Sequence, residues 1–464
     1  MNTRFNKILL IKPPKTEMGG YTAPPINLLY LAAFLKKNKP RVSINIVDGS
    51  FDGEEEITAN LKRLNPDLVG ITILTPGRHE GIRIAGLAKK YSQARVVLGG
   101  VHPTIMWKQM MEYFKEVDFV VRGEGEITLW QLVSGKPLEY IDGLVWRDKE
   151  RGIICNRDRQ LIKDLDSLPF PAWDMIDLLK YPPKGEGIVN GINLGKEVRI
   201  PIIFSRGCMG SCTFCSSWKI WKGYRSRSGK NVTNEIELLV NKYKIRNFNF
   251  FDDTLGGNRK AMTDFCQRII RRRFKIALEG NTRVNIVNKK LLVLMKKAGF
   301  HTLAFGVESG SCRLLKKINK GITIDMIKKA FLLTKQAGIK TTALIMYGLP
   351  ESTKRDNRLT EKLLAEIKPD GIGTVGETWI FPGTTLYEQA KKNRLINDRF
   401  WLGKKPCYIY RGGMEKDPVQ WKLKLRDWLR FHFLGTIFDR IRIKILLLKA
   451  SRIPCQQLCS CRRA

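Results

Sequence analysis

The sequence predicts an α/β protein with two successive parts, a doubly wound parallel sheet and then an open or partial barrel of six βα units. Three observations favour this fold class. Short apolar runs alternate with segments of helical periodicity, which is typical of parallel sheets buried beneath helices. The alternation occurs twice, over residues 5–135 and again from Arg199. Between the two lies a stretch rich in proline and turn residues, which indicates a domain junction.

The first domain, residues 1–135, contains five predicted strands. A segment of helical periodicity begins at Pro25, where proline suits the first turn of a helix. Ligands of doubly wound sheets bind at the carboxyl ends of the strands. The loops at those ends, residues 75–81, 99–104 and 122–126, are rich in glycine, which suits close backbone approach to a large ligand. The predicted strands are Lys7–Ile11, Ser43–Val47, Leu68–Leu74, Arg95–Gly100 and Asp118–Val121.

Residues 136–195 are predicted to be a linker that packs across the junction, because they include the turn-rich run DLDSLPFPAWDMIDLLKYPPKGEG. The second domain, residues 196–393, has its expected chemistry at the carboxyl ends of its strands, as in βα barrels. Residues 394–464 are predicted to form a basic helical extension. The strands expected in the second domain are Arg199–Ser205, Asn247–Asp253, Lys275–Asn281, Thr302–Ser309, Thr341–Pro350 and Gly371–Phe381.

The chain is strongly basic, with 82 lysines and arginines against 44 acidic residues and a formal charge of +38. Such an excess is compatible with a nucleic-acid partner, an anionic membrane surface or a generally basic proteome. The apolar run near the N-terminus is short and lacks a cleavage pattern, so it predicts a strand and not a signal peptide. No stretch approaches the ~20 apolar residues of a membrane span. We therefore expect a cytoplasmic protein.

Three of the ten cysteines, Cys208, Cys212 and Cys215, stand together in SRGCMGSCTFCSS, directly after the first strand of the second domain. A tight group of thiols in a large α/β chain favours a reducing compartment and a metal site over a disulfide scaffold. Three thiolates select zinc or an iron–sulfur cluster. Structural zinc would need a fourth ligand from a second nearby pair, and none is close in sequence, although His301 could arrive from elsewhere in the fold. An iron–sulfur cluster can leave one iron open to a substrate.

With Phe214 before the last cysteine, the Cys-x-x-x-Cys-x-aromatic-Cys pattern resembles the signature of radical S-adenosylmethionine enzymes. This resemblance implies a 4Fe–4S cluster on Cys208, Cys212 and Cys215, whose fourth iron is chelated by the amino and carboxylate groups of S-adenosylmethionine. In that family an electron from the reduced cluster cleaves the sulfonium and leaves a 5′-deoxyadenosyl radical. The resemblance also implies an electron donor such as ferredoxin or flavodoxin.

Polar residues and glycines also stand at the ends of the following strands, in FFDDT, EGNTRVN, FGVESGS and YGLPEST. A pair of aspartates alone is more often a helix cap. The evidence for a binding site is therefore that such residues recur at the ends of successive strands. The resemblance, which covers about residues 196–390, implies that these positions contact S-adenosylmethionine. Asp252 and Asp253 are implied to contact the methionine moiety, and Glu308 and Ser309 the ribose or carboxylate. Gly348 is implied to lie near the adenine, and Arg283 is a further implied contact.

A doubly wound domain joined to such a core by LPFPAW resembles the cobalamin-binding branch of the family. The loops LGGVHPT and VDFVVRGEGE are similar to those of the anaerobic oxidative cyclase of bacteriochlorophyll synthesis and of hopanoid-modifying enzymes. The likeness implies that cobalamin binds to this domain, and the alternative is a degenerate nucleotide fold that acts only as a scaffold. The implied cobalamin contacts are Thr75, Gly99, Gly100, His102 and Glu124.

The Asp-x-His-x-x-Gly pattern of methionine-synthase-type cobalamin domains is missing. All four histidines have Gly or Arg two residues before them. We therefore expect no histidine below the cobalt. His102 remains a candidate contact, but a histidine before proline in a turn is more often structural.

The C-terminal segment, residues 415–450, has an apolar stripe at helical spacing, with cations mainly away from it. This pattern predicts a helix that lies on the inner face of an anionic membrane or, alternatively, one that packs its stripe on the barrel. Three further cysteines, Cys455, Cys459 and Cys461, either bind a second cluster or, as we favour, belong to a loose tail. The stripe consists of Leu434, Ile437, Phe438, Ile441, Ile445 and Leu448.

Taken with the resemblance, the sequence predicts a cobalamin-dependent radical enzyme that methylates, or oxidatively modifies, an unactivated carbon of a hydrophobic small molecule such as a lipid or tetrapyrrole. RNA modification is the alternative that the charge suggests. However, RNA methylthiotransferases of the family carry three extra N-terminal cysteines, and here no cysteine precedes Cys155. Nucleic acid is therefore not the expected partner. A non-catalytic cobalamin or redox sensor is the third alternative.

Overall fold

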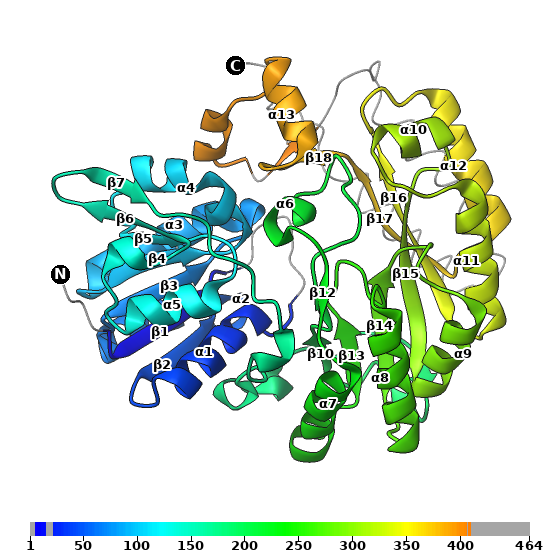
Figure 1. The fold of residues 1–464 in the computed structure, drawn as a ribbon, viewed down its shortest axis with the longest axis horizontal. Coiled ribbons are helices and arrows are strands. Elements are labelled where there is room, and N and C mark those ends of the chain that lie inside the picture. Colours follow the sequence, from blue (N-terminus) through cyan, green and yellow to red (C-terminus); the bar gives the residue numbers. More distant parts are fainter. Residues whose placement is uncertain (1–4, 15–21, 406, 410–464) are drawn as a thin grey trace.

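The computed structural model describes residues 5–14, 22–405 and 407–409. Two sheets lie side by side, each covered by helices, and a small C-terminal unit lies across their junction (Figure 1). The predicted α/β fold, with a doubly wound sheet followed by an open barrel, is confirmed. No helix in the described part of the chain has the length and apolar character that crossing a membrane requires.

The first sheet is parallel over five strands and ends in an antiparallel hairpin. Its strands are arranged in the order β2-β1-β3-β4-β5-β6-β7. Their bounds are β1 (Lys7–Lys12), β2 (Ser43–Asp48), β3 (Leu68–Thr72), β4 (Arg95–Gly99), β5 (Phe119–Val121), β6 (Leu144–Asp148) and β7 (Gly152–Cys155).

The hairpin of β6 and β7 differs from the linker predicted over residues 136–195. Leu144 and Val145 are fully buried and extend the sheet core, while the polar residues between the strands form the turn. The rest of this stretch is irregular, with short 3-10 turns and the small hairpin of β8 (Ile188–Val189) and β9 (Ile192–Asn193). The turn-forming residues in this stretch correctly predicted loops, but they concealed the last two strands of the sheet.

Helices cover both faces of the first sheet, because successive strand residues point to opposite faces. Ile8 and Leu10 of β1 face one core, and Leu9 and Ile11 face the other. The first core also contains α1 (Ile26–Asn38) and α5 (Gly125–Val133); the second contains α2 (Gly49–Leu64), α3 (Arg78–Tyr91) and α4 (Val101–Tyr113). The carboxyl ends of β1, β3, β4 and β5 consequently share one edge, where ligands of such sheets bind.

The second sheet is parallel throughout, and β10 and β17 are its two edges, so the barrel is open. Its order is β10-β13-β14-β15-β16-β17. The strands are β10 (Arg199–Ile202), β13 (Asn247–Phe250), β14 (Ala277–Thr282), β15 (Phe300–Glu308), β16 (Lys340–Tyr347) and β17 (Gly371–Glu377). The covering helices include α7 (Gly229–Tyr243), α8 (Arg259–Arg271), α9 (Lys289–Ala298), α11 (Ile324–Gln336) and α12 (Lys354–Ile367).

The second sheet buries one of its faces more completely than the other. Leu303, Phe305 and Val307 of β15 are fully buried in the core with the helices, and the alternate residues Ala304 and Gly306 are only half-buried. This period of two is expected for a strand with helices on one face and an open interior on the other. The residues at the carboxyl ends of these strands therefore border an accessible interior.

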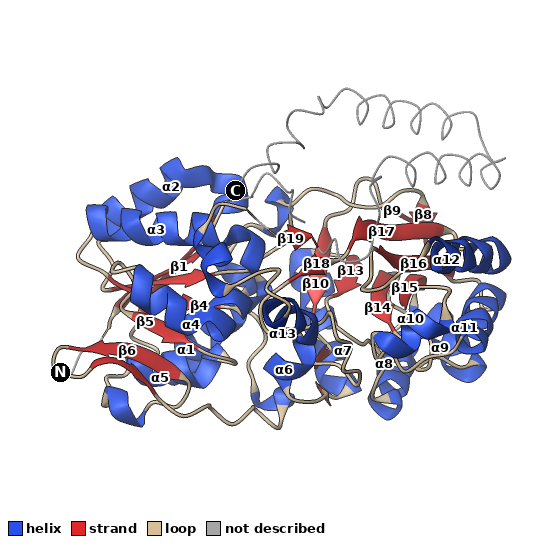
Figure 2. Cartoon of the chain, turned by 90° about the horizontal axis from the view of Figure 1, so that it is seen from above, coloured by secondary structure: helices blue, strands red, loops and turns tan. Residues whose placement is uncertain are grey.

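The C-terminal unit, residues 378–405 and 407–409, is called the cap below. It contains β18 (Trp379–Ile380), α13 (Thr385–Lys392), η6 (Asp398–Leu402) and β19 (Tyr408–Ile409), and seen from above it lies between the two sheets (Figure 2). Its apolar core joins α13 and η6, so the boundary predicted at residue 393 divides one packed unit. The predicted helix over 415–450 and Cys455, Cys459 and Cys461 lie outside the described residues.

Candidate functional site

The three cysteines lie in one loop, residues 207–216, between the short strand β11 (Ser205–Arg206) and the helix α6 (Ser217–Trp221). The backbone N–H of Cys215 donates to the carbonyl of Cys212 at 3.1 Å and turns the loop. The N–H groups of Gly210 and Ser217 point to the sulfurs of Cys208 and Cys215, at 3.3 and 3.4 Å. The loop therefore presents both thiols and backbone donors.

Glycine is required at the start of this cysteine loop. Gly207 has a φ of +89°, and a Cβ there would lie 1.9 Å from the carbonyl oxygen of Gly223. Gly223 precedes β12 (Arg225–Ser226), which pairs with β11. The close approach of these two segments fixes the point at which the chain leaves the barrel and enters the loop.

Side chains that follow β13 and β14 also lie close to the cysteine sulfurs. The hydroxyl of Thr254 lies 3.0 Å from Cys208 Sγ, and Arg283 Nη1 lies 4.0 Å from Cys212 Sγ. Both residues are buried. Burial raises the pKa of Cys215 to about 11, so that without metal this sulfur is a thiol. Binding of a metal would therefore displace its proton.

The donor set fits an iron–sulfur cluster better than a single ion. Over residues 5–14, 22–405 and 407–409, no three His, Cys, Asp or Glu side chains are arranged to hold one metal ion. A 4Fe–4S cluster takes each cysteine on a different iron, so its ligands surround a volume and need not meet at one point. The soft thiol ligands and the N–H groups directed at sulfur suit such a cluster.

The six residues predicted to contact S-adenosylmethionine all lie at the carboxyl ends of consecutive strands, β13 to β16. Asp253 is exposed and accepts a hydrogen bond from the hydroxyl of Ser217. Asp252 is buried and accepts from the N–H of Phe204 at 3.1 Å and from both the N–H and the hydroxyl of Ser205. Burial raises its pKa to about 7, against the opposing effect of these donors. Asp252 thus braces the chain that leads into the cysteine loop.

Glu308 and Arg283 belong to a second buried network. Glu308 has a φ of +63°, which costs a non-glycine residue about 1–3 kcal/mol. Its carboxylate lies 2.6 Å from Lys320 Nζ, and the carbonyl of Lys320 accepts from Arg283. The adjoining carbonyl of Ile318 accepts from the N–H of Thr213 at 3.0 Å. The residues predicted to bind the cofactor therefore also support the cysteine loop from the barrel side.

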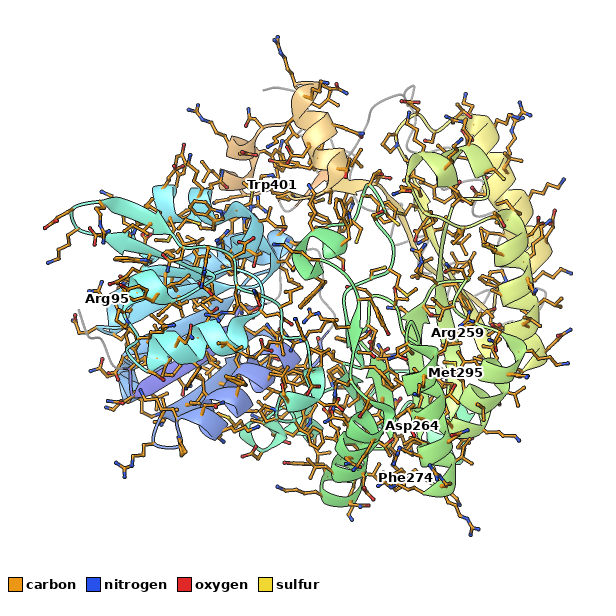
Figure 3. The ribbon with its side chains drawn as sticks, in the orientation of Figure 1. Arg95, Arg259, Asp264, Phe274, Met295 and Trp401 are labelled. Atoms are coloured by element: carbon orange, nitrogen blue, oxygen red, sulfur yellow. The ribbon has the colours of Figure 1, made fainter. Side chains whose placement is uncertain are left out.

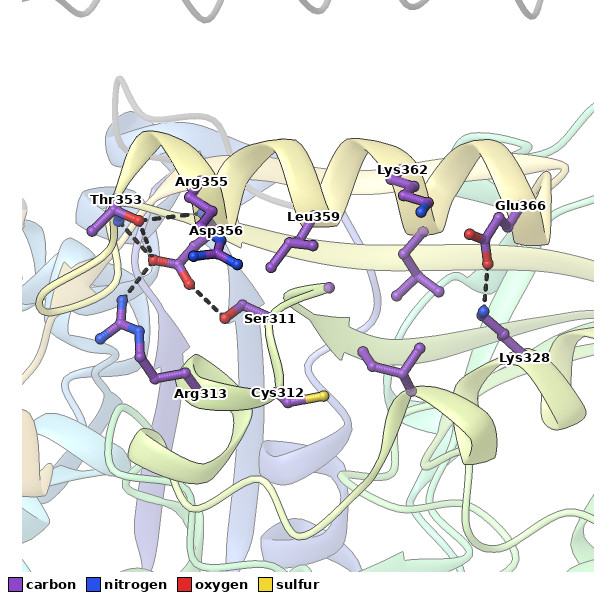
Figure 4. Close-up of a pocket in the computed structure, with 13 residues that line it drawn as sticks. Ser311, Cys312, Arg313, Lys328, Thr353, Arg355, Asp356, Leu359, Lys362 and Glu366 are labelled. Carbon is purple, nitrogen blue, oxygen red and sulfur yellow. Dashed lines mark hydrogen bonds and ion pairs between the residues drawn. The ribbon is translucent and has the colours of Figure 1, made fainter.

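The segment after β15 is anchored from outside the barrel by α12 (Figure 4). Asp356 accepts from the hydroxyl of Ser311 at 2.5 Å and from Arg313 at 2.6 Å, and it forms a capping box with Thr353. Ser309 is buried beside Thr360, with their hydroxyl oxygens 3.3 Å apart. A cavity of about 470 Å³ lies here, among side chains of α10 (Cys312–Lys317), α11 and α12. The sixth predicted contact, Gly348, follows β16 with a φ of +68°.

At the edge of the first sheet, two of the predicted cobalamin contacts are covered by the cap. Thr75 and His102 are buried, with Thr75 Oγ1 3.3 Å from His102 Nδ1. Trp401 of the cap meets the His102 ring edge-on, at 6.4 Å between centroids, and lies where the cap adjoins the first domain (Figure 3). Burial, together with the charges of Arg78 and His79, lowers the pKa of His102 to about 3, so the imidazole is neutral.

Arg78 fastens the cap to this edge. Its guanidinium donates to the carbonyls of Trp401 at 2.7 Å and of Gly403 and Lys405 at 2.6 Å, and to that of Thr75 at 3.0 Å. The arginine is buried, and its guanidinium lies 5.1 Å from the Trp401 ring. Movement of the cap would break several charge-assisted hydrogen bonds at once.

The accessible part of the edge lies next to these buried residues. Gly99 and Gly100 are half-buried, and a Cβ added at Gly99 would meet no atom within 4 Å. Leu74, which follows β3, is 64% exposed. A single exposed leucine is common on protein surfaces. Leu74, however, places an apolar side chain at the carboxyl end of a central strand, where ligands of such sheets bind. The sequence pattern predicts Leu74 to be the last residue of a buried strand, and its exposure is therefore a difference between the prediction and the structure.

Glu124, the last predicted cobalamin contact, joins the two domains. Its carboxylate accepts from Arg206 at 2.6 Å, from Arg225 at 3.0 Å and from the N–H of Ile162 at 2.7 Å. Glu126 accepts from the other Nη of Arg206 at 2.5 Å. Burial alone would lower the pKa of Arg206, but the two carboxylates raise it above its ordinary value. The oxygens of Glu124 are thus engaged at the domain junction.

Several residues that contact the site were not predicted from the sequence, because their residue types alone do not indicate these contacts. Arg206 in SRGC and Glu126 in RGEGE are close in sequence to predicted site residues, but only the fold brings the two together. The same holds for Lys320 opposite Glu308 and for Thr254 beside Cys208. For the charged residues, the sequence signal that could have revealed these roles was their position next to a glycine-rich functional loop.

Comparison with known proteins assigns a family to each of the two domains. Residues 202–364 match the model of the Radical SAM superfamily, and residues 18–133 match that of the B12 binding domain. The chain belongs to the cobalamin-binding radical S-adenosylmethionine enzymes. Its cofactors are accordingly a 4Fe–4S cluster, S-adenosylmethionine and cobalamin.

Two curated relatives and one solved structure are similar to this chain. The chain is 34% identical to the uncharacterized methyltransferase PH0819 of Pyrococcus horikoshii, over 85% of each chain. It is 32% identical to the anaerobic magnesium-protoporphyrin IX monomethyl ester cyclase of Rubrivivax gelatinosus, over 78% of this chain but only 66% of the cyclase. The cobalamin-dependent S-adenosylmethionine radical enzyme OxsB, with aqua-cobalamin bound, shares the fold. Its TM-score is 0.76 at 15% identity, over 96% of this chain and 71% of OxsB.

The two adjacent aspartates provide a stability test of the site. Asp252→Ala leaves the buried donors of Phe204 and Ser205 without an acceptor, so it should lower the free energy of unfolding by about 1–3 kcal/mol. Asp253→Ala, at an exposed position, should change it by no more than about 0.5 kcal/mol. Urea unfolding of both variants measures the difference. Equal effects would contradict the role of Asp252 as an internal brace.

Proposed function

We propose that this enzyme transfers a methyl group from S-adenosylmethionine, through cobalamin, to an unactivated carbon of a hydrophobic small molecule. The observation that carries the proposal is the attachment of the cysteine loop to the carboxyl edge of the first sheet by the buried pairs of Arg206 with Glu124 and Glu126. Such an attachment would bring the two proposed cofactor positions next to each other. Ring-forming oxidation is the second candidate, favoured by the cyclase relative.

In the proposed site, Cys208, Cys212 and Cys215 would hold the cluster. The hydroxyl of Thr254 and the N–H of Gly210 lie within hydrogen-bond distance of Cys208 Sγ, and the N–H of Ser217 lies within that distance of Cys215 Sγ. When bound, the cluster supplies the electron that cleaves S-adenosylmethionine and cobalamin carries the methyl group. Of the predicted S-adenosylmethionine contacts, Asp253 is accessible, Gly348 contributes backbone, and Glu308 and Arg283 orient the loop that faces the ligand. We propose that the electron comes from a donor such as ferredoxin or flavodoxin.

Cobalamin is proposed to lie against Leu74, Gly99 and Gly100, where the edge of the first sheet is accessible. A hydrophobic substrate is supported by exposed apolar side chains in loops at the strand ends of both sheets. Leu74 is 64% exposed and Met209, beside Cys208, is 57% exposed. Apolar side chains at these strand ends are compatible with a hydrophobic substrate such as a lipid or a tetrapyrrole, and the cyclase relative favours a tetrapyrrole.

The reaction type can be measured directly. Anaerobically reconstituted enzyme would be supplied with cobalamin, a reductant, methyl-labelled S-adenosylmethionine and an extract of lipids or porphyrins. Label in an extracted product is expected for methyl transfer. A modified product without label, formed together with 5′-deoxyadenosine, would contradict methyl transfer and favour oxidation.

The cysteine assignment predicts the outcome of substitution. Changing Cys208, Cys212 and Cys215 to Ala should abolish the brown chromophore, the bound iron and the formation of 5′-deoxyadenosine, because no thiolate ligands remain. A matched variant carries Cys155→Ala and Cys312→Ala, which are exposed positions, and should keep all three properties. Iron content that is unchanged in the triple variant would sink the assignment.

The absence of a histidine below cobalt is also testable. His102 is buried beneath Trp401, and His79 contacts the carbonyl of Gly403, so both rings are engaged by the cap. Paramagnetic resonance of the Co(II) form should show no nitrogen splitting from an axial imidazole. The proposal fails if that splitting is present and disappears in His102→Ala.

We also propose that the segment 415–450 binds reversibly to an anionic membrane, where a hydrophobic substrate would be dissolved. Each cation near such a surface contributes about 1 kcal/mol. Truncation at Lys416 should therefore abolish sedimentation with anionic liposomes at low salt, and high salt should weaken the binding of the full chain. If both proteins bind alike and the truncated one unfolds more easily, the segment packs on the barrel instead.

A further inference from the structure

One buried ion cluster connects the edge of the first sheet to the start of the cysteine loop. Arg206 stands two residues before Cys208, and Glu124 and Glu126 follow β5, which ends at Val121. The side chains of Arg206, Glu124 and Glu126 are 8%, 1% and 5% exposed. Water therefore contributes little to solvating these charges, and each group depends on its partners.

The geometry of the cluster restricts rotation as well as separation. The two terminal nitrogens of Arg206 donate to different carboxylates, at 2.6 Å to Glu124 and 2.5 Å to Glu126. A planar guanidinium that holds two acceptors fixes its own plane and the distance between the two acceptors. Arg225 of β12 supplies the second positive charge, so two cations and two carboxylates balance. A lysine at position 206 would keep the charge but lose the planar fork.

The cysteine loop is attached to the first domain at a second point through the cap. The carbonyl of Thr213 accepts from the N–H of Leu386 at 2.9 Å, and Phe214 packs into the cap core beside Met106 of α4. The cap is in turn held by Arg78 of α3. Cys208 and Cys212 lie between these two attachment points, so a shift of the first domain would displace the loop that carries them.

We propose that Arg206, through Glu124 and Glu126, is a positioning residue that sets the distance and orientation between the cysteine loop and the cobalamin-binding edge. This inference rests on the proposed function, in which the loop holds the cluster and the edge holds cobalamin. Arg206 acts through the loop and not on the reacting atoms. Without its fork, both cofactors still bind, but their relative placement is no longer fixed.

The test uses the magnetic interaction between the two cofactors in the full-length reconstituted enzyme. A reduced cluster is paramagnetic and speeds the relaxation of nearby Co(II) cobalamin, which raises the microwave power needed to saturate the cobalt signal. The variants are Arg206→Gln, Arg206→Lys and Glu126→Gln, the last being nearly isosteric and suitable if the arginine variants fold poorly. Iron, cobalamin and 5′-deoxyadenosine formation are measured on the same samples.

In the unaltered enzyme, reduction of the cluster should raise the saturation power of the cobalt signal. Arg206→Gln should lose most of this rise while iron and cobalamin contents stay unchanged, because the fork is removed. Glu126→Gln, whose amide oxygen still accepts from Arg206 but carries no charge, and Arg206→Lys should each lose part of it. The matched control is Arg199→Gln, which breaks the part-buried pair with Glu279 at the opposite end of β10. This control should keep the full rise.

Two outcomes would overturn the inference. A full rise in Arg206→Gln and Glu126→Gln at normal cofactor occupancy, or an equal loss in Arg199→Gln, shows that the cluster of charges does not set the cofactor placement. The proposed function fails differently, because the unaltered enzyme would then bind no cobalamin or show no rise on reduction of the cluster. The measurement on the unaltered enzyme therefore separates the two failures.

Discussion

Arg206 and its two carboxylate partners impose the constraint on which the arrangement of the domains depends. Charges with so little exposure are stable only when they are paired, because breaking one partner from a buried pair typically costs about 3–5 kcal/mol. Separating the domains would leave Glu124, Glu126, Arg206 and Arg225 without these partners. The sequence thus places acidic residues on one domain and basic residues on the other, and their burial orients the two sheets toward each other.

Within the described residues, the cysteine loop is contacted by the chain that precedes it, by the barrel and by the cap. Asp252 holds the chain before the loop, while Arg283 and the segment around Lys320 contact it from the barrel. The cap contacts its middle at Thr213 and Phe214. An iron–sulfur site benefits from such preorganisation, because ligand orientation and hydrogen bonds to sulfur determine cluster stability and potential. The same contacts connect the loop to the edge where cobalamin is proposed to bind.

Much of the fold could be predicted because its signals are local. Apolar runs and their period identified the five parallel strands of the first sheet and the six of the second, and the cysteine spacing identified the expected cluster site. Strand topology then required Asp252, Arg283, Glu308 and Gly348 to lie at the same end of the second sheet. These conclusions need only neighbouring residues and general rules of parallel sheets.

The remaining features depend on contacts between residues far apart in the chain. Arg78 binds the carbonyl of Trp401, and Glu124 binds Arg206, through pairings that no local pattern announces. For that reason His102 and Glu124 were predicted as cobalamin contacts, whereas the structure engages them with Trp401 and Arg206. The β6–β7 hairpin was missed because glycine, proline and charged residues around it favour turns.

We propose that the cysteine loop and the carboxyl edge of the first sheet form one catalytic junction that holds both cofactors. Anomalous diffraction from crystals of the anaerobically reconstituted enzyme, recorded at the iron and cobalt absorption edges, would locate both metals in one experiment. We expect an iron peak within the triangle of Cys208, Cys212 and Cys215, and a cobalt peak on the same side of the junction, beside Leu74 and Gly99. A cobalt peak at the opposite end of the first sheet, or iron bound away from these cysteines, would contradict it.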